Sequence, residues 1–450
     1  MNINRFVQSV KLTVSMVIRI ATTRDLLKKH ITTPLYQNAY YLMISSALDS
    51  VLGFVFLIIA ARLYSNEALG LGSAIIAALG LLTLLSELGL SIWLIRFLPG
   101  AGRKANDMLN TCITLSGTAS IFISLIFLTG LGFWSPELLP VRQHPVFFTS
   151  FVIFAIVKAL QPLVSSAFLA KRNTKFILFR SVIRNSLNVT LVGFFAFLFN
   201  SAFGIFASCF LGAAITMTIS LAWFLPKVQA GYRPFPKIKR EMLKKLWRYS
   251  TGNYVGQLLL QMTNFVLPLM VINVLDAERS AYFYVAWTIV TVLFVIPSSL
   301  FNSLFAEASI EEKSFRTNVI KSSRLMLLLA LPIIILVIII ADWLLLLFGQ
   351  TYSDNGTTLL RLAILSVIPW GINYLYISIA RVRKSVGDVI KVAGASTIIS
   401  LGLSYFLALK MSLVGVGIGY LAGQSIVAIA VVFSMWRDYH SRPERTIIKR

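Results

Sequence analysis

The chain has 450 residues, of which 57% are hydrophobic and only 13% are charged, and its formal net charge is +24. This composition excludes a soluble globular protein, because so much apolar surface needs lipid as its solvent. In a membrane protein the excess of Lys and Arg belongs to loops beside an anionic inner leaflet, so no nucleic-acid partner is expected.

The first 38 residues are basic and contain no clean apolar core. Phe6, Val10 and Val14 recur at helical spacing between Lys and Arg residues. This pattern predicts a basic amphipathic segment, residues 1–38, that lies on the cytoplasmic surface of the membrane.

Twelve mostly apolar segments follow, each near the length of about 20 residues that a spanning helix needs. The uncharged stretch 185–226 is too long for one span, and Asn200, Ser201 and Gly204 supply a turn that divides it. The predicted spans are residues 39–63, 68–95, 108–133, 146–170, 176–199, 202–226, 250–275, 280–306, 325–348, 358–380, 386–409 and 412–436.

Basic residues alternate between the connections of these spans. Most Lys and Arg residues fall in the two tails and in every second loop, and the remaining loops hold only Arg62, Arg142, Arg279, Arg361 and Lys410. The bias predicts a multi-pass protein of the cell (inner or plasma) membrane with both termini in the cytoplasm. Lys158 and Arg184 are left inside spans.

The most basic connection, residues 227–248, follows six spans and precedes six. It predicts a cytoplasmic linker with an amphipathic helix between two six-helix bundles, residues 39–226 and 249–436, with a basic tail at 437–450. The turn at 60–70 is similar to that at 272–281, since each joins an apolar helix to an acidic turn and then small residues. Transporters are often built from such repeats, with the substrate between them.

Amides recur along the seventh span. Asn253, Gln257, Gln261 and Asn264 share one helix face, and amides both donate and accept hydrogen bonds, as sugar hydroxyls require. This face indicates either the wall of a wet cavity or hydrogen bonds that join neighbouring helices.

Ionisable residues within spans are costly and are therefore functional candidates. Asp49 in the first span is expected to bind a coupling cation, carry a proton or pair with a base. Lys158 cannot easily reach the surface, so we expect it to face a cavity or to pair with Asp49 or Glu87. Glu87 itself is ambiguous, because it falls near the predicted inner interface.

The fifth span carries Arg180, Arg184 and Asn188 along one face. Arg180 is expected to snorkel to the cytoplasm. Arg184 lies a turn deeper, where it either snorkels too or meets a diphosphate, which a guanidinium grips with two hydrogen bonds. Five prolines inside spans permit kinks: Pro162, Pro268, Pro297, Pro332 and Pro369.

Three segments resemble a known family. They are residues 40–43, residues 61–70 and residues 85–90 ahead of the Arg-Phe-Leu-Pro run at 96–99. With the six-plus-six layout, they make the chain similar to the polysaccharide-transport branch of the multidrug/oligosaccharidyl-lipid/polysaccharide exporter superfamily, which includes the Wzx-type O-antigen flippases of lipopolysaccharide synthesis. The resemblance implies two bundles around a central cavity and alternating access. It also implies movement of a polyprenyl-diphosphate-linked oligosaccharide from the cytoplasmic to the outer leaflet.

Two alternatives remain at this point. One is a drug exporter of the same superfamily coupled to H⁺ or Na⁺, although the scarcity of deep acids favours an anionic glycan lipid over a cationic drug. The other is a membrane-embedded glycan enzyme, which usually needs a large loop or carboxylates near a histidine. We therefore expect a transporter that is not an enzyme and has no cofactor, with membrane lipid, a polysaccharide polymerase and assembly proteins as further candidate partners.

Overall fold

The computed structural model describes residues 34–308 and 315–441, and within these ranges it contains helices and no strands. The predicted surface segment at 1–38 and the tail at 437–450 lie mostly outside the described residues. Side chains at 242–253 are likewise not described.

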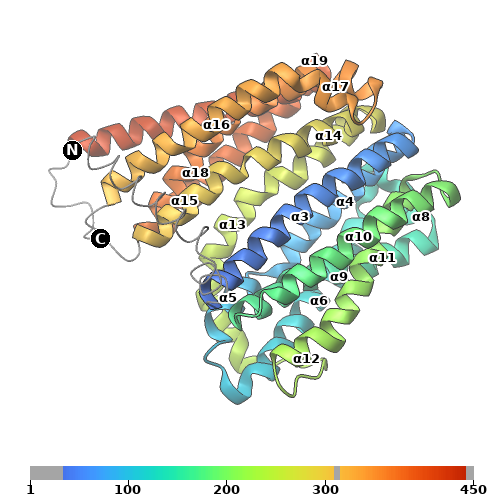
Figure 1. The fold of residues 1–450 in the computed structure, drawn as a ribbon, viewed down its shortest axis with the longest axis vertical. Coiled ribbons are helices and arrows are strands. Elements are labelled where there is room, and N and C mark those ends of the chain that lie inside the picture. The colour runs from blue at the N-terminus through green and yellow to red at the C-terminus, as the bar shows by residue number, and fades with distance from the viewer. Residues whose placement is uncertain (1–33, 309–314, 442–450) are drawn as a thin grey trace, which may run out of the picture.

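Two groups of helices, here called the N lobe and the C lobe, make up the fold (Figure 1). The N lobe consists of α3 (Pro34–Leu63), α4 (Asn66–Glu87), α5 (Leu90–Phe97), η1 (Gly102–Lys104), α6 (Ala105–Thr129), α7 (Leu131–Trp134), η2 (Pro136–Leu138), α8 (Leu139–Gln143), α9 (Pro145–Ala170), α10 (Lys175–Leu198), α11 (Ala202–Ile219), η3 (Ser220–Phe224) and α12 (Leu225–Val228). The C lobe consists of α13 (Arg240–Val274), α14 (Ala277–Leu293), α15 (Val295–Ala308), α16 (Phe315–Leu346), α17 (Gln350–Leu365), α18 (Val367–Val382) and α19 (Val386–Ser441).

Eleven helical segments in the described ranges are long and apolar enough to cross a membrane, and the last of them folds back on itself. The backbone reverses at Ser412, whose φ is 53°. Beyond it, Gly415, Gly419 and Gly423 lie against the backbone of Leu407, Ser404 and Ser400 in that order, which is an antiparallel pairing. The glycines let the two arms of α19 approach closely. Counting both arms gives twelve spans, as the sequence predicts.

Some predicted boundaries are wrong in detail. The second span ends at Glu87 rather than continuing to residue 95, because Leu88 and Gly89 both take left-handed backbone angles (φ of 52° and 73°). Pro297 and Pro369 do interrupt their spans: α14 gives way to α15, and α17 to α18, three residues before each proline. Pro162, Pro268 and Pro332 lie inside uninterrupted helices.

The connection between the lobes is partly extended. Residues 229–239 contain no helix, and Arg240 then begins α13, which continues into the seventh span without a break. The predicted linker helix is therefore the first part of that span. Asn106 donates to Gly231 O (3.0 Å) and Asn110 donates to Arg233 O (3.0 Å), and these bonds hold the extended segment against α6.

The two similar turns noted in the sequence pack against each other at the end of the bundle opposite the linker, here called the far end. Each turn supplies a helix N-cap: Ser65 accepts from Ala68 N (3.2 Å) and Asp276 accepts from Arg279 N (2.6 Å). Asn66 then donates to Tyr282 Oη at 3.1 Å across the lobes. The two similar turns, one from each lobe, are therefore in direct contact.

A glycine allows this approach. A Cβ added at Gly70 would lie 1.7 Å from Ala277 O, so only glycine fits where α4 meets the start of α14. Arg62 adds a second link, because its guanidinium donates to Leu346 O (2.7 Å) and Leu347 O (3.0 Å) at the C-terminus of α16.

Elsewhere the lobes share one seam. Helix α4 packs along α13. Near the linker end, Tyr254 Oη donates to Leu84 O (3.1 Å) and Leu85 O (3.0 Å). Helix α3 behaves differently, since Ala60 at its far end is fully buried while Met43 and Val51 are 65% and 59% exposed. The lobes consequently lie at an angle (Figure 1), joined at the far end and separate along the linker half of α3.

Candidate functional site

An ion pair inside the N lobe is the centre of the candidate site. Arg184 Nη2 on α10 lies 2.8 Å from Asp49 Oδ1 on α3, and the two side chains are 23% and 38% exposed. Asp49 therefore pairs with a base, one of the three roles the sequence left open. The partner is Arg184 and not Lys158, so the pairing with Asp49, one of the alternatives for Lys158, is not formed.

Neighbouring residues of α10 hold the Asp49 carboxylate in place. Asn185 Nδ2 donates to Oδ1 (2.5 Å) and Ser181 Oγ donates to Oδ2 (3.3 Å). Ser45, one turn before Asp49, donates to Ser181 Oγ at 2.9 Å. With three donors on one carboxylate, the acid is fixed and orients the guanidinium beside it.

Arg184 keeps unused hydrogen-bonding capacity. A guanidinium has five N–H donors, and within the described residues only the contact to Asp49 engages its side chain. Lys158 on α9 is half-buried and close enough to Arg184 to interact electrostatically, and no described residue forms an ion pair with it. The site therefore brings two basic side chains close to one acid.

Arg180 has a structural position, so the expectation that it snorkels is wrong. Its side chain is buried at 5% exposure and donates to Gln161 O (3.3 Å) and to Ser165 Oγ. Both partners belong to α9, which lies beside α10 at this depth. The guanidinium finds its acceptors there and does not have to reach the surface.

Asn188 packs between helices. With its amide nitrogen turned toward α11, it donates to Ser208 O (3.3 Å) and to Arg184 O (3.1 Å) of its own helix. It also fills the space above Gly212, where an added Cβ would lie 2.0 Å from the Asn188 amide. Asn188 thus joins α10 to α11 one helical turn after Arg184.

Glu87 stands apart from this cluster. It is the last residue of α4, is buried at 9% exposure, and lies at the linker end of the seam near Tyr254. The expected pairing of Lys158 with Glu87 is not formed, and Asp49 and Glu87 occupy different sites.

The described amides on this face of α13 form no hydrogen bond to another helix. Gln261 is exposed, and Asn264 Nδ2 donates to Gln261 Oε1 at 3.0 Å on the same helix. Among the described side chains, neither these two nor Gln257 forms a hydrogen bond to another helix; Asn253 is outside that set. A pair of threonines joins α13 to α19 instead, because Thr263 Oγ1 donates to Thr397 Oγ1 at 3.2 Å.

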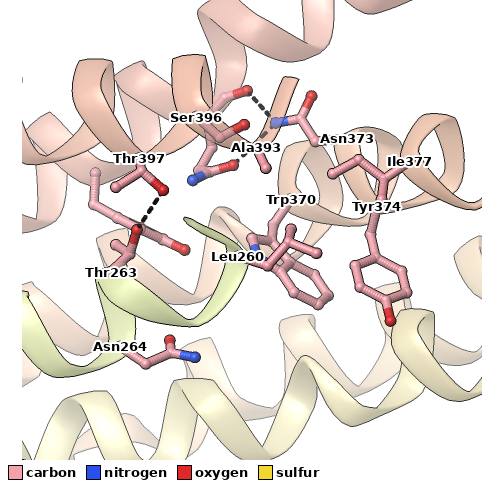
Figure 2. A pocket seen from close by; sticks show the side chains of 12 residues that line it. Leu260, Thr263, Asn264, Trp370, Asn373, Tyr374, Ile377, Ala393, Ser396 and Thr397 are labelled. Carbon is pink, nitrogen blue, oxygen red and sulfur yellow. Dashed lines mark hydrogen bonds between the residues drawn. The ribbon is translucent and has the colours of Figure 1, made fainter. Parts of the chain in front are cut away.

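Asn264 borders a narrow crevice of the C lobe, here called the C-lobe crevice (Figure 2). Helices α13 and α18 form its walls and the two arms of α19 form its floor. Its lining residues are Leu260, Thr263, Asn264, Trp370, Asn373, Tyr374, Ile377, Ala393, Ser396, Thr397, Tyr420 and Gln424. None of them carries a charge.

Several of these side chains were not predicted from the sequence. Ser181 and Asn185 sit at i and i+4 on α10 beside Arg184, a spacing that was available as a signal. Trp370, Asn373, Ser396 and Gln424 come from three distant stretches of the chain. Only the packing of α18 on α19 brings them together.

Comparison with known proteins identifies the family. Residues 35–310 match the family described as polysaccharide biosynthesis protein. No curated protein sequence matches the chain.

Solved structures identify the fold. The chain is similar to an inward-facing multidrug resistance MATE family transporter of the MOP superfamily, with a TM-score of 0.70 and 14% identity over 88% of this chain and 98% of that one. It is equally similar to the lipid II flippase MurJ in an inward closed conformation, with a TM-score of 0.70 and 14% identity over 88% and 87%. A third similar structure is a MOP superfamily transporter from Pyrococcus furiosus, whose binding pocket is described as having reverse polarity (TM-score 0.61, 14% identity, 91% and 96%). The chain is thus a multi-pass membrane protein with the fold of MOP-superfamily transporters, and it belongs to the polysaccharide biosynthesis protein family.

Proposed function

We propose that this protein is a flippase that moves a polyprenyl-diphosphate-linked oligosaccharide, such as an O-antigen unit, from the cytoplasmic to the outer leaflet of the cell membrane. The observation that carries the proposal is Arg184, held by Asp49 and left with unused donors inside a span. A diphosphate is the group that such a guanidinium binds best, because its oxygens accept paired N–H donors.

Charge supports an anionic substrate. Lys158 and Arg184 outnumber Asp49, so the site repels organic cations and attracts phosphate. Membership of a polysaccharide biosynthesis family supports a glycan as the attached group. The likeness to a MATE transporter keeps drug export as the second candidate, and a cationic drug would need a site of the opposite charge.

The lobes supply a means of movement. They are joined at the far end and separate along the linker half of α3, an arrangement suited to admitting substrate from the linker side. We propose that rocking about the α4–α13 seam exchanges this arrangement for one open at the far end. Transport of this kind requires no covalent bond to be made or broken. H⁺ or Na⁺ is the proposed coupling ion.

Transport in proteoliposomes tests the proposal. A fluorescent polyprenyl-diphosphate disaccharide should move between leaflets in vesicles that contain the protein, and a fluorescent organic cation should not. Movement of the cation without movement of the glycan lipid would replace the flippase by the drug exporter.

A further inference from the structure

The C-lobe crevice contains buried polar atoms that lack a partner. Asn373 is 2% exposed and its Nδ2 donates to Gln424 Oε1 (2.9 Å) and Gln424 O (3.1 Å), whereas its Oδ1 receives no hydrogen bond from any described residue. Ser396 is 9% exposed and its Oγ has no partner. Figure 2 shows both side chains at the same end of the crevice. Buried groups of this kind are normally paired, so both oxygens keep the capacity to accept a hydrogen bond.

Aromatic rings form one wall. Trp370 is partly exposed and stacks on Phe294 (ring centroids 4.5 Å apart) and on Tyr374 (5.1 Å). Tyr374 Oη in turn donates to Asn302 Oδ1 at 3.0 Å. The stack fixes the indole in one orientation, and opposite it Asn264 brings an amide from α13 (Figure 2).

The size and charge of the crevice restrict its occupant. Its depth has room for a single water-sized group, and its lining contains no Asp, Glu, Lys, Arg or His. A metal ion lacks the carboxylates it prefers. A neutral sugar matches the chemistry of this lining, because its ring could lie at the mouth against the indole and the amide while one hydroxyl points toward the depth.

We propose that the C-lobe crevice is a sugar-binding subsite in which a neutral monosaccharide offers a hydroxyl to Asn373 Oδ1 and Ser396 Oγ and packs on Trp370. This rests on the proposed flippase function and adds that the two parts of the substrate are bound by different lobes. The N lobe holds the diphosphate through Arg184, and the C lobe holds the glycan.

Two lipids separate these contributions. Binding to the full-length protein in nanodiscs is measured for a polyprenyl diphosphate that bears one N-acetylglucosamine and for the same lipid without the sugar. We expect the wild-type protein to bind the sugar-bearing lipid about tenfold more tightly. Ser396→Ala and Trp370→Ala should each reduce this preference by a factor of at least about five, because one hydrogen bond or aromatic contact contributes on that order. The affinity of either variant for the sugarless lipid should stay unchanged.

Controls distinguish the subsite from the fold and from the proposed function. Ser396→Ala removes only an unpartnered hydroxyl, so it should fold normally, and Ser298→Ala on α15 should preserve the difference because its Oγ bonds only to Val295 O. If both crevice variants keep the full difference, the crevice holds water and the proposal is wrong. Equal binding of both lipids by the wild type overturns the subsite alone, whereas binding of neither lipid overturns the flippase function as well.

Discussion

Asp49 Oδ1 on α3 and Arg184 Nη2 on α10 are 2.8 Å apart, and Asn185 and Ser181 complete the hydrogen bonds to that carboxylate. The pair joins α3, whose span is the least buried in the N lobe, to the neighbouring helix α10. Both residues are partly exposed, so we assign the pair to orienting Arg184 more than to stability.

This assignment predicts the outcome of a double-mutant cycle. Asp49→Asn and Arg184→Gln should each lower the melting temperature slightly, with a coupling on the order of 1 kcal/mol because both side chains are partly exposed. Thermal unfolding in detergent measures it. A coupling above about 3 kcal/mol would make the pair a structural one and contradict the assignment.

Arg180 should behave in the opposite way. Its buried guanidinium bonds to Gln161 O and Ser165, and a hydrogen bond to a charged group contributes about 1.5–3 kcal/mol. Arg180→Gln should therefore lower the melting temperature clearly. The exposed Lys175 on the same helix provides the control, since Lys175→Gln should leave the temperature unchanged. Equal effects of the two variants would place Arg180 at the surface.

The contact between the lobes at Gly70 can be tested by adding one carbon. In Gly70→Ala the new Cβ would clash with Ala277 O, so the far end should open. Spin labels at the exposed positions Glu67 and Arg279 should report a longer distance in this variant. Gly53→Ala is the matched control, because nothing lies within 4 Å of its Cβ. An unchanged distance in Gly70→Ala would mean that the lobes are not held together there.

The attachment of the linker depends partly on one acid. Asp107 Oδ1 lies 2.5 Å from Lys237 Nζ, and its Oδ2 lies 3.2 Å from Lys239 Nζ. These solvent-screened pairs contribute little to global stability. Asp107→Asn should nevertheless loosen the extended segment 229–239 locally, and trypsin should cleave after Lys237 a few times faster than in the wild type. Asp354→Asn, at another exposed acid, should leave that rate unchanged.

Much of the fold was predictable because lipid imposes simple rules on sequence. Span length and alternating basic loops predict twelve helices, and the similar turns at 60–70 and 272–281 predict two related halves, but their direct contact is visible only in the structure. The break after Glu87 was harder to place, since Leu88 adopts a left-handed conformation that its residue type does not announce.

The candidate site was predictable only residue by residue. A charge inside a span is visible in sequence, so Asp49, Lys158 and Arg184 were identified, but the choice of partner depends on how α3 packs on α10. The same limit explains Arg180, whose acceptors lie on α9. The C-lobe crevice was not predicted, because its uncharged residues become conspicuous only when α18 and α19 meet.

The central claim is that Arg184 binds the diphosphate of a lipid-linked glycan during transport. Its most direct test is the initial rate at which a labelled polyprenyl-diphosphate disaccharide crosses the bilayer of proteoliposomes containing wild type, Arg184→Gln or Lys175→Gln. We predict that Arg184→Gln lowers the rate at least tenfold at equal protein incorporation, and that Lys175→Gln leaves it within twofold of wild type. A wild-type rate in Arg184→Gln would contradict the account.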